Sequence, residues 1–219
     1  MPFLPIYIYF IALSFIASLT IFIRPVIVYK YLKLFPLFLL ATFGAEFWGS
    51  YLYSIGRHNV FIYNFFTIVE FVFYLYVLRL LIHKPRVKNI IAVTIIAYIL
   101  LSCINVFFVQ GTKVFHTNSY SVGCLLIVLF CIYYFLELFR NPKSMKLAAS
   151  PAFWICSGLL FFYCCSFPAY ALFSFGGALP PVIVTNLADI FTVLNIMLYS
   201  LFTIAFLCSR NLKSTLSQQ

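Results

Sequence analysis

The chain has 219 residues, of which 65% are hydrophobic and only 8% are charged, and its mean hydropathy is +1.09. Because a soluble domain carries roughly 25% charged residues, this composition excludes an ordinary soluble protein and indicates an integral membrane protein. The net charge of +10 would suggest nucleic-acid binding in a soluble protein. Here the basic residues stand in short clusters between long apolar runs, so we interpret them as topology signals and expect no nucleic-acid partner.

Seven apolar runs follow one another along the chain, and each has the length of about 20 residues that a membrane-spanning helix needs. We predict spans near residues 3–23, 34–54, 60–82, 89–109, 122–140, 151–174 and 186–208. Arg24 and Lys30 follow the first run and no basic segment precedes it, so we expect a retained helix rather than a signal peptide. The short connections predict one all-α membrane domain of seven transmembrane helices over residues 1–219.

The basic residues predict the orientation of the spans. The connections after the first, third and fifth spans and the C-terminal tail hold Arg24, Lys30, Lys33, Arg79, Lys84, Arg86, Lys88, Arg140, Lys143, Lys146, Arg210 and Lys213. The opposite side holds only Arg57 and Lys113. Because Lys and Arg are enriched on the cytoplasmic side of membrane proteins, we predict that the N-terminus lies outside and the C-terminus inside. We expect a multi-pass protein of the cell membrane, and specifically of a bacterial inner membrane.

The cysteine and histidine residues predict neither a metal site nor a cofactor. No two cysteines form a C-x-x-C pair, and all of them stand within or beside apolar runs: Cys103, Cys124, Cys131, Cys156, Cys164, Cys165 and Cys208. His58 and His116 fall on the predicted outer side and His83 on the inner side, so they cannot form one metal site. We expect the cysteines to pack as small hydrophobic residues.

All four acidic residues fall within predicted spans: Glu46, Glu70, Glu137 and Asp189. Glu137 stands near the inner end of its span, three residues before Arg140, and we predict an interfacial ion pair between them. At the centre of a membrane a charged carboxylate costs about 2.5–3.5 kcal/mol on insertion scales. We therefore expect the other three carboxylates to face the bundle interior, to be protonated, or both.

Helical spacing places further polar residues on the same faces as these three acids. We predict that the second, third and seventh spans share a polar interior, and that Glu46 and Glu70 can share a proton if their helices are neighbours. The predicted ligand- or proton-binding residues are Glu46, Glu70, Asp189, Asn64, Thr67, Tyr74, Thr192, Asn195 and Tyr199. The alternative is a hydrogen-bonded network that only sets the helix register.

The third and seventh spans resemble each other. Phe66–Tyr74 (FTIVEFVFY) aligns without gaps to Phe191–Tyr199 (FTVLNIMLY), which places Glu70 opposite Asn195. A parallel repeat of three helices, a linking helix and three more would produce this similarity, and chance likeness of two apolar helices is the alternative. In this topology the chain resembles the seven-helix superfamily of sugar-efflux and PQ-loop transporters, microbial opsins and G-protein-coupled receptors. The stretch FWICSGLLFFY is also similar to bacterial seven-helix membrane proteins.

The sequence departs from each branch of that superfamily at a defining motif. Opsins carry a retinal-linking lysine in the seventh helix, and residues 186–208 contain no lysine. The chain has no Pro-Gln pair. Sugar-efflux proteins use prolines within four of their helices, whereas here Pro36 and Pro151 stand at predicted helix starts and Pro168 is internal. The resemblance therefore implies a topology and no particular ligand.

Three functions fit these features. The leading hypothesis is proton- or cation-linked transport of a small solute across the lipid bilayer, with the carboxylates binding the ion. A sensor or receptor acting through a separate cytoplasmic protein partner is the second, and a structural or assembly role is the third. A membrane-embedded enzyme is a weaker alternative, because the set of several histidines with Asp and Ser that intramembrane zinc hydrolysis needs is missing and no motif supports aspartyl chemistry by Glu46 and Glu70. A water path from either face to Glu70 would favour transport, and a pocket open only outward would favour sensing.

Overall fold

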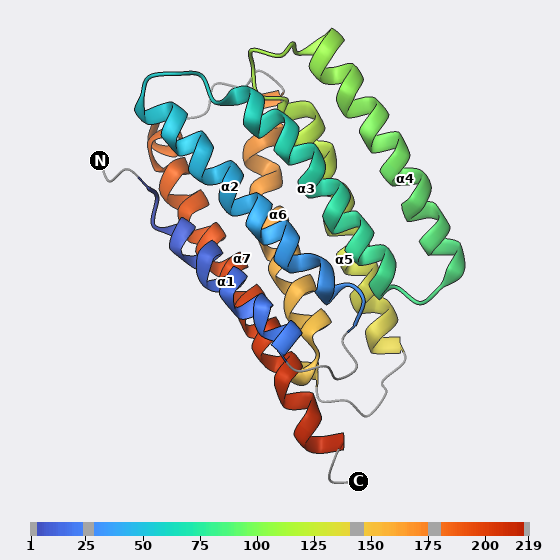
Figure 1. Cartoon of the computed structure of the whole chain (residues 1–219). Helices are drawn as coiled ribbons and strands as arrows, with labels where there is room; N and C mark the ends of the chain where they lie inside the picture. Colours follow the sequence, from blue (N-terminus) through green and yellow to red (C-terminus); the bar gives the residue numbers. More distant parts are fainter. Residues whose placement is uncertain (1–3, 24–28, 141–146, 175–180, 217–219) are drawn as a thin grey trace.

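The computed structural model describes residues 4–23, 29–140, 147–174 and 181–216, and within them all regular structure is helical (Figure 1). Its α-helices are α1 (Tyr7–Ile23), α2 (Phe35–Ser54), α3 (Val60–Leu81), α4 (Pro85–Ile104), α5 (Thr117–Arg140), α6 (Pro151–Ser174) and α7 (Pro181–Leu216). A five-residue π-helical turn, Asn105–Val109, follows α4. The predicted all-α class is confirmed.

Six segments are long and apolar enough to cross a membrane: Leu32–Ser54, Val60–Leu81, Pro85–Val109, Thr117–Arg140, Pro151–Ala171 and Asn186–Cys208. They coincide with the second to seventh predicted spans, so the chain is a polytopic membrane protein in contact with the bilayer. Helix α1 has 17 residues. At 1.5 Å per residue it is about 26 Å long, slightly less than the roughly 30 Å of a hydrocarbon core.

Proline and glycine residues mark several helix boundaries. Pro85, Pro151 and Pro181 each begin a helix, because proline has no N–H to lose there and its backbone angle φ is already helical. Gly56 follows α2 with φ +70° and Gly111 follows the π-helical turn with φ +83°. A residue with a β-carbon rarely adopts these angles, so glycine permits the chain to reverse at both points.

Six of the helices form a closed ring. Going round it, α1 packs on α2, α2 on α3, α3 on α5, α5 on α6, α6 on α7, and α7 again on α1. Helix α4 packs mainly on α3 and lies at the edge of the bundle (Figure 1). The two consecutive triplets, α1–α3 and α5–α7, therefore occupy equivalent halves of the ring, and α4 connects them from outside.

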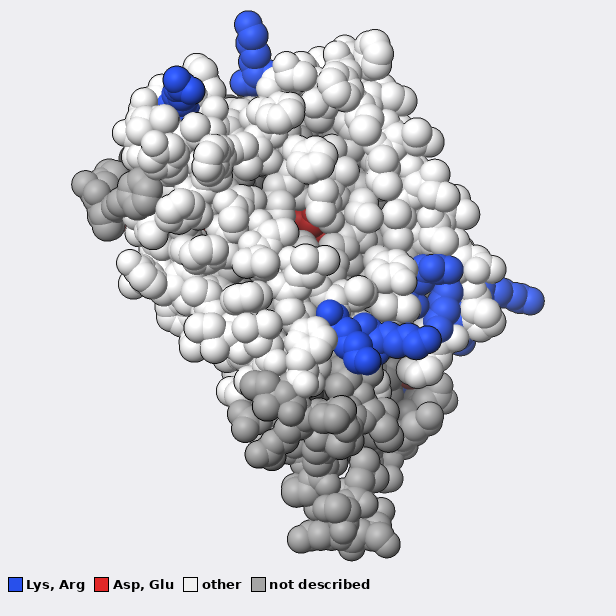
Figure 2. All heavy atoms as spheres, in the orientation of Figure 1, with Lys and Arg blue, Asp and Glu red and all other residues white. Residues whose placement is uncertain are grey.

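Basic side chains lie at the two ends of the bundle (Figure 2). One end, which we call the Arg57 end, contains the α2–α3 connection and the α4–α5 connection with Lys113. The opposite end, here the Lys84 end, contains the other described basic residues: Lys30, Lys33, Arg79, Lys84, Arg86, Lys88 and Arg140. Between the two ends, Figure 2 shows a mostly uncharged face with one acidic side chain visible near its middle.

Phenylalanines from three helices pack together toward the Lys84 end, one pair stacked and the others edge to face. This aromatic plug consists of Phe35 and Phe38 from α2, Phe73 from α3, and Phe202 and Phe206 from α7. The rings of Phe38 and Phe73 stack with centroids 3.8 Å apart, and Phe35 contacts Phe202 and Phe206 at 5.4 and 5.6 Å. Since α2 begins at Phe35 on the Lys84 side, the plug lies in that half of the bundle.

Candidate functional site

Glu46 lies where α1, α2 and α3 meet. Its Oε2 accepts a hydrogen bond from the Tyr7 hydroxyl at 2.8 Å and a longer one from the Tyr63 hydroxyl at 3.4 Å. Tyr7 is the first residue of α1 and Tyr63 lies in the first turn of α3. Both helices begin at the Arg57 end, so Glu46 lies in the half of the bundle nearer that end.

Gly49 makes the Tyr63 contact possible. It follows Glu46 by about one helical turn, and its own position is buried. A β-carbon added at Gly49 would lie 2.6 Å from the Tyr63 hydroxyl oxygen and 2.8 Å from the adjoining ring carbon. The missing side chain therefore leaves the space that the Tyr63 ring occupies beside the carboxylate.

Glu70 lies halfway along α3 and interacts across the ring. Its Oε1 accepts a hydrogen bond from the Tyr163 hydroxyl of α6 at 3.2 Å. The side chains of Phe71, Tyr74 and Tyr163 around it are fully buried. The Tyr74 hydroxyl, one turn further along α3, has no hydrogen-bond partner among the described residues. Glu70 is thus a carboxylate in an aromatic surrounding with a single donor identified.

Further tyrosines complete a carboxylate centre, which we define as Glu46, Glu70 and the phenol groups around them. Glu46 lies within electrostatic range of Glu70, so negative charge on one carboxylate opposes charge on the other. The hydroxyls of the centre come from α1, α3, α5, α6 and α7: Tyr7, Tyr63, Tyr74, Tyr120, Tyr163, Tyr170 and Tyr199. In the described part of the chain the sole ion pair is His83–Glu137, so no cation compensates either carboxylate there.

The structure brings only some of the predicted site residues together. Tyr74 and Tyr199 are buried within the carboxylate centre. Thr67, Thr192 and Asn195 instead donate to carbonyl groups four residues earlier in their own helices, at 2.6, 2.8 and 2.8 Å. Each of these three side chains therefore donates to its own helix rather than to a carboxylate.

Asp189 does not join the centre, contrary to the predicted convergence of three acids. Its side chain is exposed on α7, whereas Glu46 and Glu70 are half-buried and lie within electrostatic range of each other. The physical reason is angular: Asp189 lies about 80° around the helix from Tyr199, at the edge of the predicted polar face. A polar face that covers so wide an angle of the helix includes positions whose side chains point away from the ring of helices.

Asn64 belongs to a separate polar contact at the Arg57 end. Its Nδ2 donates to the Val114 carbonyl at 3.0 Å, and its Oδ1 accepts from the His116 backbone N–H at 3.2 Å. The ring Nε2 of His116 donates to the Asn64 carbonyl at 2.9 Å, since a carbonyl can only accept. His116 is fully buried, and burial lowers its pKa below the ordinary value. This contact fastens the start of α5 to α3.

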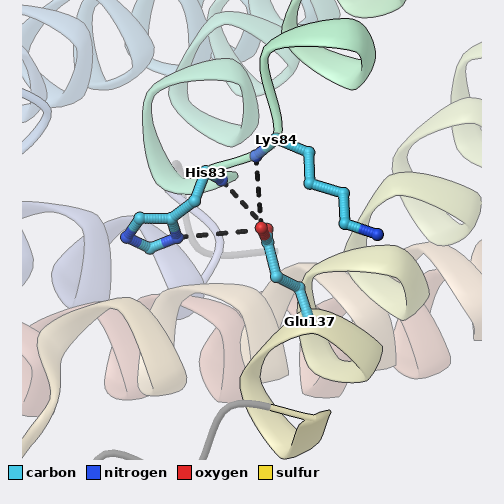
Figure 3. A network of polar contacts seen from close by, with 3 residues as sticks. All are labelled: His83, Lys84 and Glu137. Carbon is cyan, nitrogen blue, oxygen red and sulfur yellow. Dashed lines mark hydrogen bonds and ion pairs between the residues drawn. The ribbon is translucent and has the colours of Figure 1, made fainter.

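Glu137 makes the corresponding contact at the Lys84 end (Figure 3). Its two oxygens accept the backbone N–H groups of His83 at 2.9 Å and Lys84 at 3.2 Å, and His83 Nδ1 lies 3.9 Å away. The predicted partner Arg140 is not paired with it among the described residues. Unpaired N–H groups near a helix start favour a carboxylate, and an ion pair with an exposed guanidinium would contribute only about 0–1 kcal/mol. Glu137 thus fastens the end of α5 to the start of α4.

An open groove of about 360 Å³ lies on the surface between α5 and α6. It is lined by Phe135, Phe153, Ser157, Leu160, Phe161 and Cys164. None of these residues is a member of the carboxylate centre, so the groove is separate from it. In the described ranges no three His, Cys, Asp or Glu side chains are placed to hold a metal ion.

The residues that sequence reasoning missed are mainly tyrosines. Tyr7, Tyr120, Tyr163 and Tyr170 all lie in the centre, yet the predicted spans that hold Tyr7, Tyr163 and Tyr170 contain no acidic residue. The sequence contains only a general indication of these residues. A buried tyrosine hydroxyl usually has a hydrogen-bond partner, so a tyrosine within a span suggests a polar neighbour. That signal names no partner, because the chain contains 16 tyrosines.

No family model matches this chain, and neither a curated protein nor a solved structure matches it. The geometry of the carboxylate centre alone therefore carries the functional proposal.

Proposed function

We propose that this chain is a seven-helix membrane protein in which the carboxylate centre binds a proton or small cation and couples it to transport of a small solute. The observation that carries the proposal is the presence of two acids from neighbouring helices in one interior centre, with no cation partner among the described residues. Intramembrane carboxylates are costly when charged, and they commonly mark ion and proton pathways.

The ring supports a mechanism with two moving halves. The triplets α1–α3 and α5–α7 make equivalent contacts around it, which agrees with the repeat proposed from the α3 and α7 sequences. Under this repeat Tyr74 corresponds to Tyr199, and both are buried in the centre. Rocking of two related halves about a site between them is how many transporters expose that site to each side in turn.

The distribution of basic residues supports an orientation with the Arg57 end outside and the Lys84 end inside. The N-terminus then lies outside, the C-terminus inside, and α1 crosses the membrane as the first of seven spans. In this orientation an ion entering from outside meets Glu46 first and Glu70 next. The aromatic plug lies between Glu70 and the inner end.

Pro168 provides a position at which α6 can bend. It lies inside the helix between Tyr163 and Tyr170, both in the centre. Because proline cannot donate a backbone hydrogen bond, the helix is weakened at the preceding turn. Bending there would move Tyr163 relative to Glu70, and a change in the ring interior could separate the phenylalanines of the plug.

A flux experiment tests the proposal. The purified protein is reconstituted into liposomes, and uptake of protons (with a trapped pH-sensitive dye) and of ²²Na⁺ is driven by a membrane potential. We expect uptake of one ion, with the initial rate reduced at least tenfold in Glu46→Gln and Glu70→Gln. Asp189→Asn is the matched control, because this acid is exposed and should leave the rate unchanged. Unchanged uptake in both glutamine variants would overturn the proposal.

A sensor is the second candidate, and the aromatic plug is the observation that favours it. In the described conformation the plug lies between Glu70 and the Lys84 end. A receptor that binds a proton or solute from one side would need no opening through the plug. Such a protein would show no ion flux at all, while Glu70→Gln would still change the pH dependence of its thermal stability.

A further inference from the structure

We infer that the ion bound by the carboxylate centre is a proton carried on Glu70, with Glu46 as the carboxylate that remains charged. The inference rests on the proposed function and names its ion. Three features of the centre support it: the oxygen atoms available as ligands, the unequal hydrogen bonding of the two acids, and the buried Tyr74 hydroxyl.

The oxygen atoms around Glu70 suit a proton better than a metal ion. A hard metal cation takes about six or more oxygen ligands, and membrane transporters often supply them from carbonyls freed where helices unwind. Helices α2 and α3 are continuous α-helix through the levels of Glu46 and Glu70, so their carbonyls are used in the helix. A proton needs only one carboxylate oxygen and a nearby acceptor.

The two acids differ in how well their negative charge is stabilised. Glu46 accepts two phenol hydrogen bonds, the shorter at 2.8 Å, and lies toward the Arg57 end. Glu70 accepts one at 3.2 Å in the middle of the bundle. Hydrogen bonds donated to a carboxylate stabilise its charged form, and a second charge within range is unfavourable. The centre therefore holds one charge more easily than two, and the proton belongs on Glu70.

No basic group among the described residues faces Glu70 to change this assignment. The titratable groups within its range are the carboxylate of Glu46, the thiol of Cys124 and phenols from several helices. These phenols are Tyr74 on α3, Tyr98 on α4, Tyr120 on α5, Tyr163 and Tyr170 on α6, and Tyr199 on α7. A neutral Glu70 removes the need for a cation in this surrounding.

Tyr74 supplies an acceptor for the bound proton. Its hydroxyl is fully buried, has no partner in the described part of the chain, and lies one helical turn from Glu70. A protonated Glu70 can donate its O–H to the Tyr74 oxygen while Tyr163 donates to the other carboxyl oxygen. On uptake, a hydronium ion transfers one proton to a Glu70 oxygen and becomes water. On release the same O–H bond breaks, and the proton passes to water on the other side.

Infrared spectroscopy tests where the proton resides, independently of flux. We expect the protein in lipid at neutral pH to show a C=O stretching band of a protonated carboxylic acid. Glu70→Gln should abolish the band, whereas Glu46→Gln and the control Asp189→Asn should keep it. Tyr74→Phe should shift the band to higher frequency, because the donated hydrogen bond is lost. A band that disappears in Glu46→Gln but persists in Glu70→Gln, or a protein with no such band, would overturn the inference.

The liposome experiment then separates this inference from the proposed function. Proton uptake that is independent of Na⁺ and falls at least tenfold in Glu70→Gln supports both. Uptake of ²²Na⁺ that depends on Glu70, with no proton movement, would overturn the inference and leave the proposed function standing. Thermal unfolding of each variant in detergent serves as the folding control, and Glu70→Ala, which also lacks a carboxyl group, replaces Glu70→Gln if the latter does not fold.

Discussion

Glu46 and Glu70 are the same residue type on neighbouring helices, yet their surroundings differ. Glu46 lies near helix starts, with two tyrosine donors from other helices and a glycine that leaves one of them room. Glu70 lies midway along α3 among tightly packed rings, with one donor. The difference shows that two acids on neighbouring helices can have unequal hydrogen bonding and packing. Under the proposed function, the number of hydrogen-bond donors and the packing around each carboxylate decide which acid is charged.

The largest effect should come from removing the donors of the charged acid. In the double variant Tyr7→Phe, Tyr63→Phe, Glu46 loses both phenol hydrogen bonds. Since hydrogen bonds to a charged group contribute about 1.5–3 kcal/mol each, we expect a loss of about 3 kcal/mol in the free energy of unfolding. Tyr163→Phe should lose only about 1 kcal/mol, because its partner Glu70 is neutral. Chemical unfolding in mixed micelles measures both, and a larger loss in Tyr163→Phe would reverse the assignment of charge.

Gly123→Ala should have the next largest effect on stability, because it disturbs the tightly packed rings beside Glu70. An added β-carbon would lie 2.7–2.8 Å from three ring atoms of Phe71. That ring contacts Tyr98, Tyr120 and Tyr163 at centroid distances of 5.5, 5.3 and 5.2 Å, so it cannot turn aside. We expect a loss of about 2 kcal/mol, within the usual range for overpacking a core. Wild-type stability in this variant would mean that the Glu70 side is looser than the contacts indicate.

Gly49→Ala should have a smaller effect, because its clash is with the far end of a partly buried side chain. The β-carbon would meet the Tyr63 hydroxyl at 2.6 Å and displace it from Glu46. Losing one long hydrogen bond should reduce stability by about 1 kcal/mol. Gly44→Ala on the same helix is the matched control, since nothing lies within 4 Å of the added atom. Equal unfolding curves for the two alanine variants would contradict the role given to Gly49.

The smallest effect is a pH dependence at the Arg57 end, away from both acids. The pKa of His116 is lowered by burial in the folded protein, so the unfolded chain binds the proton more readily. The contribution of neutral His116 to stability should therefore be complete above about pH 6.5, the ordinary histidine pKa. It should decrease as the pH drops below that value toward the pKa of His116 in the folded protein. The thermal unfolding temperature between pH 5 and 7.5 measures this effect.

A matched pair of variants assigns that pH dependence to one histidine. His116→Gln should flatten the decrease in unfolding temperature, whereas His58→Gln should leave it unchanged, because the His58 side chain is exposed. A decrease of the same size in both variants would place the titrating group elsewhere in the protein.

Much of the fold could be predicted from hydropathy and a few boundary residues. The second to seventh spans agree with the helices within a few residues, and Pro85 and Pro151 stand at or close to the predicted starts. The closed ring and the outer position of α4 could not be predicted, since contacts such as α3 with α5 and α1 with α7 leave no mark in the local pattern. Glu137 shows the same limit: the nearby Arg140 suggested an ion pair, and distant backbone N–H groups hold the carboxylate instead.

By itself, the sequence determined that this protein is helical and lies in a membrane. The physical reason is that the bilayer offers no hydrogen-bond partners, so each long apolar run must satisfy its backbone within a helix. Only the tertiary structure decided which polar groups meet. Tyr7 and Glu46 are 39 residues apart in the chain, and Glu70 and Tyr163 are 93 apart. Their pairing depends on how the helices pack and rotate against each other, and the same packing left Asp189 exposed.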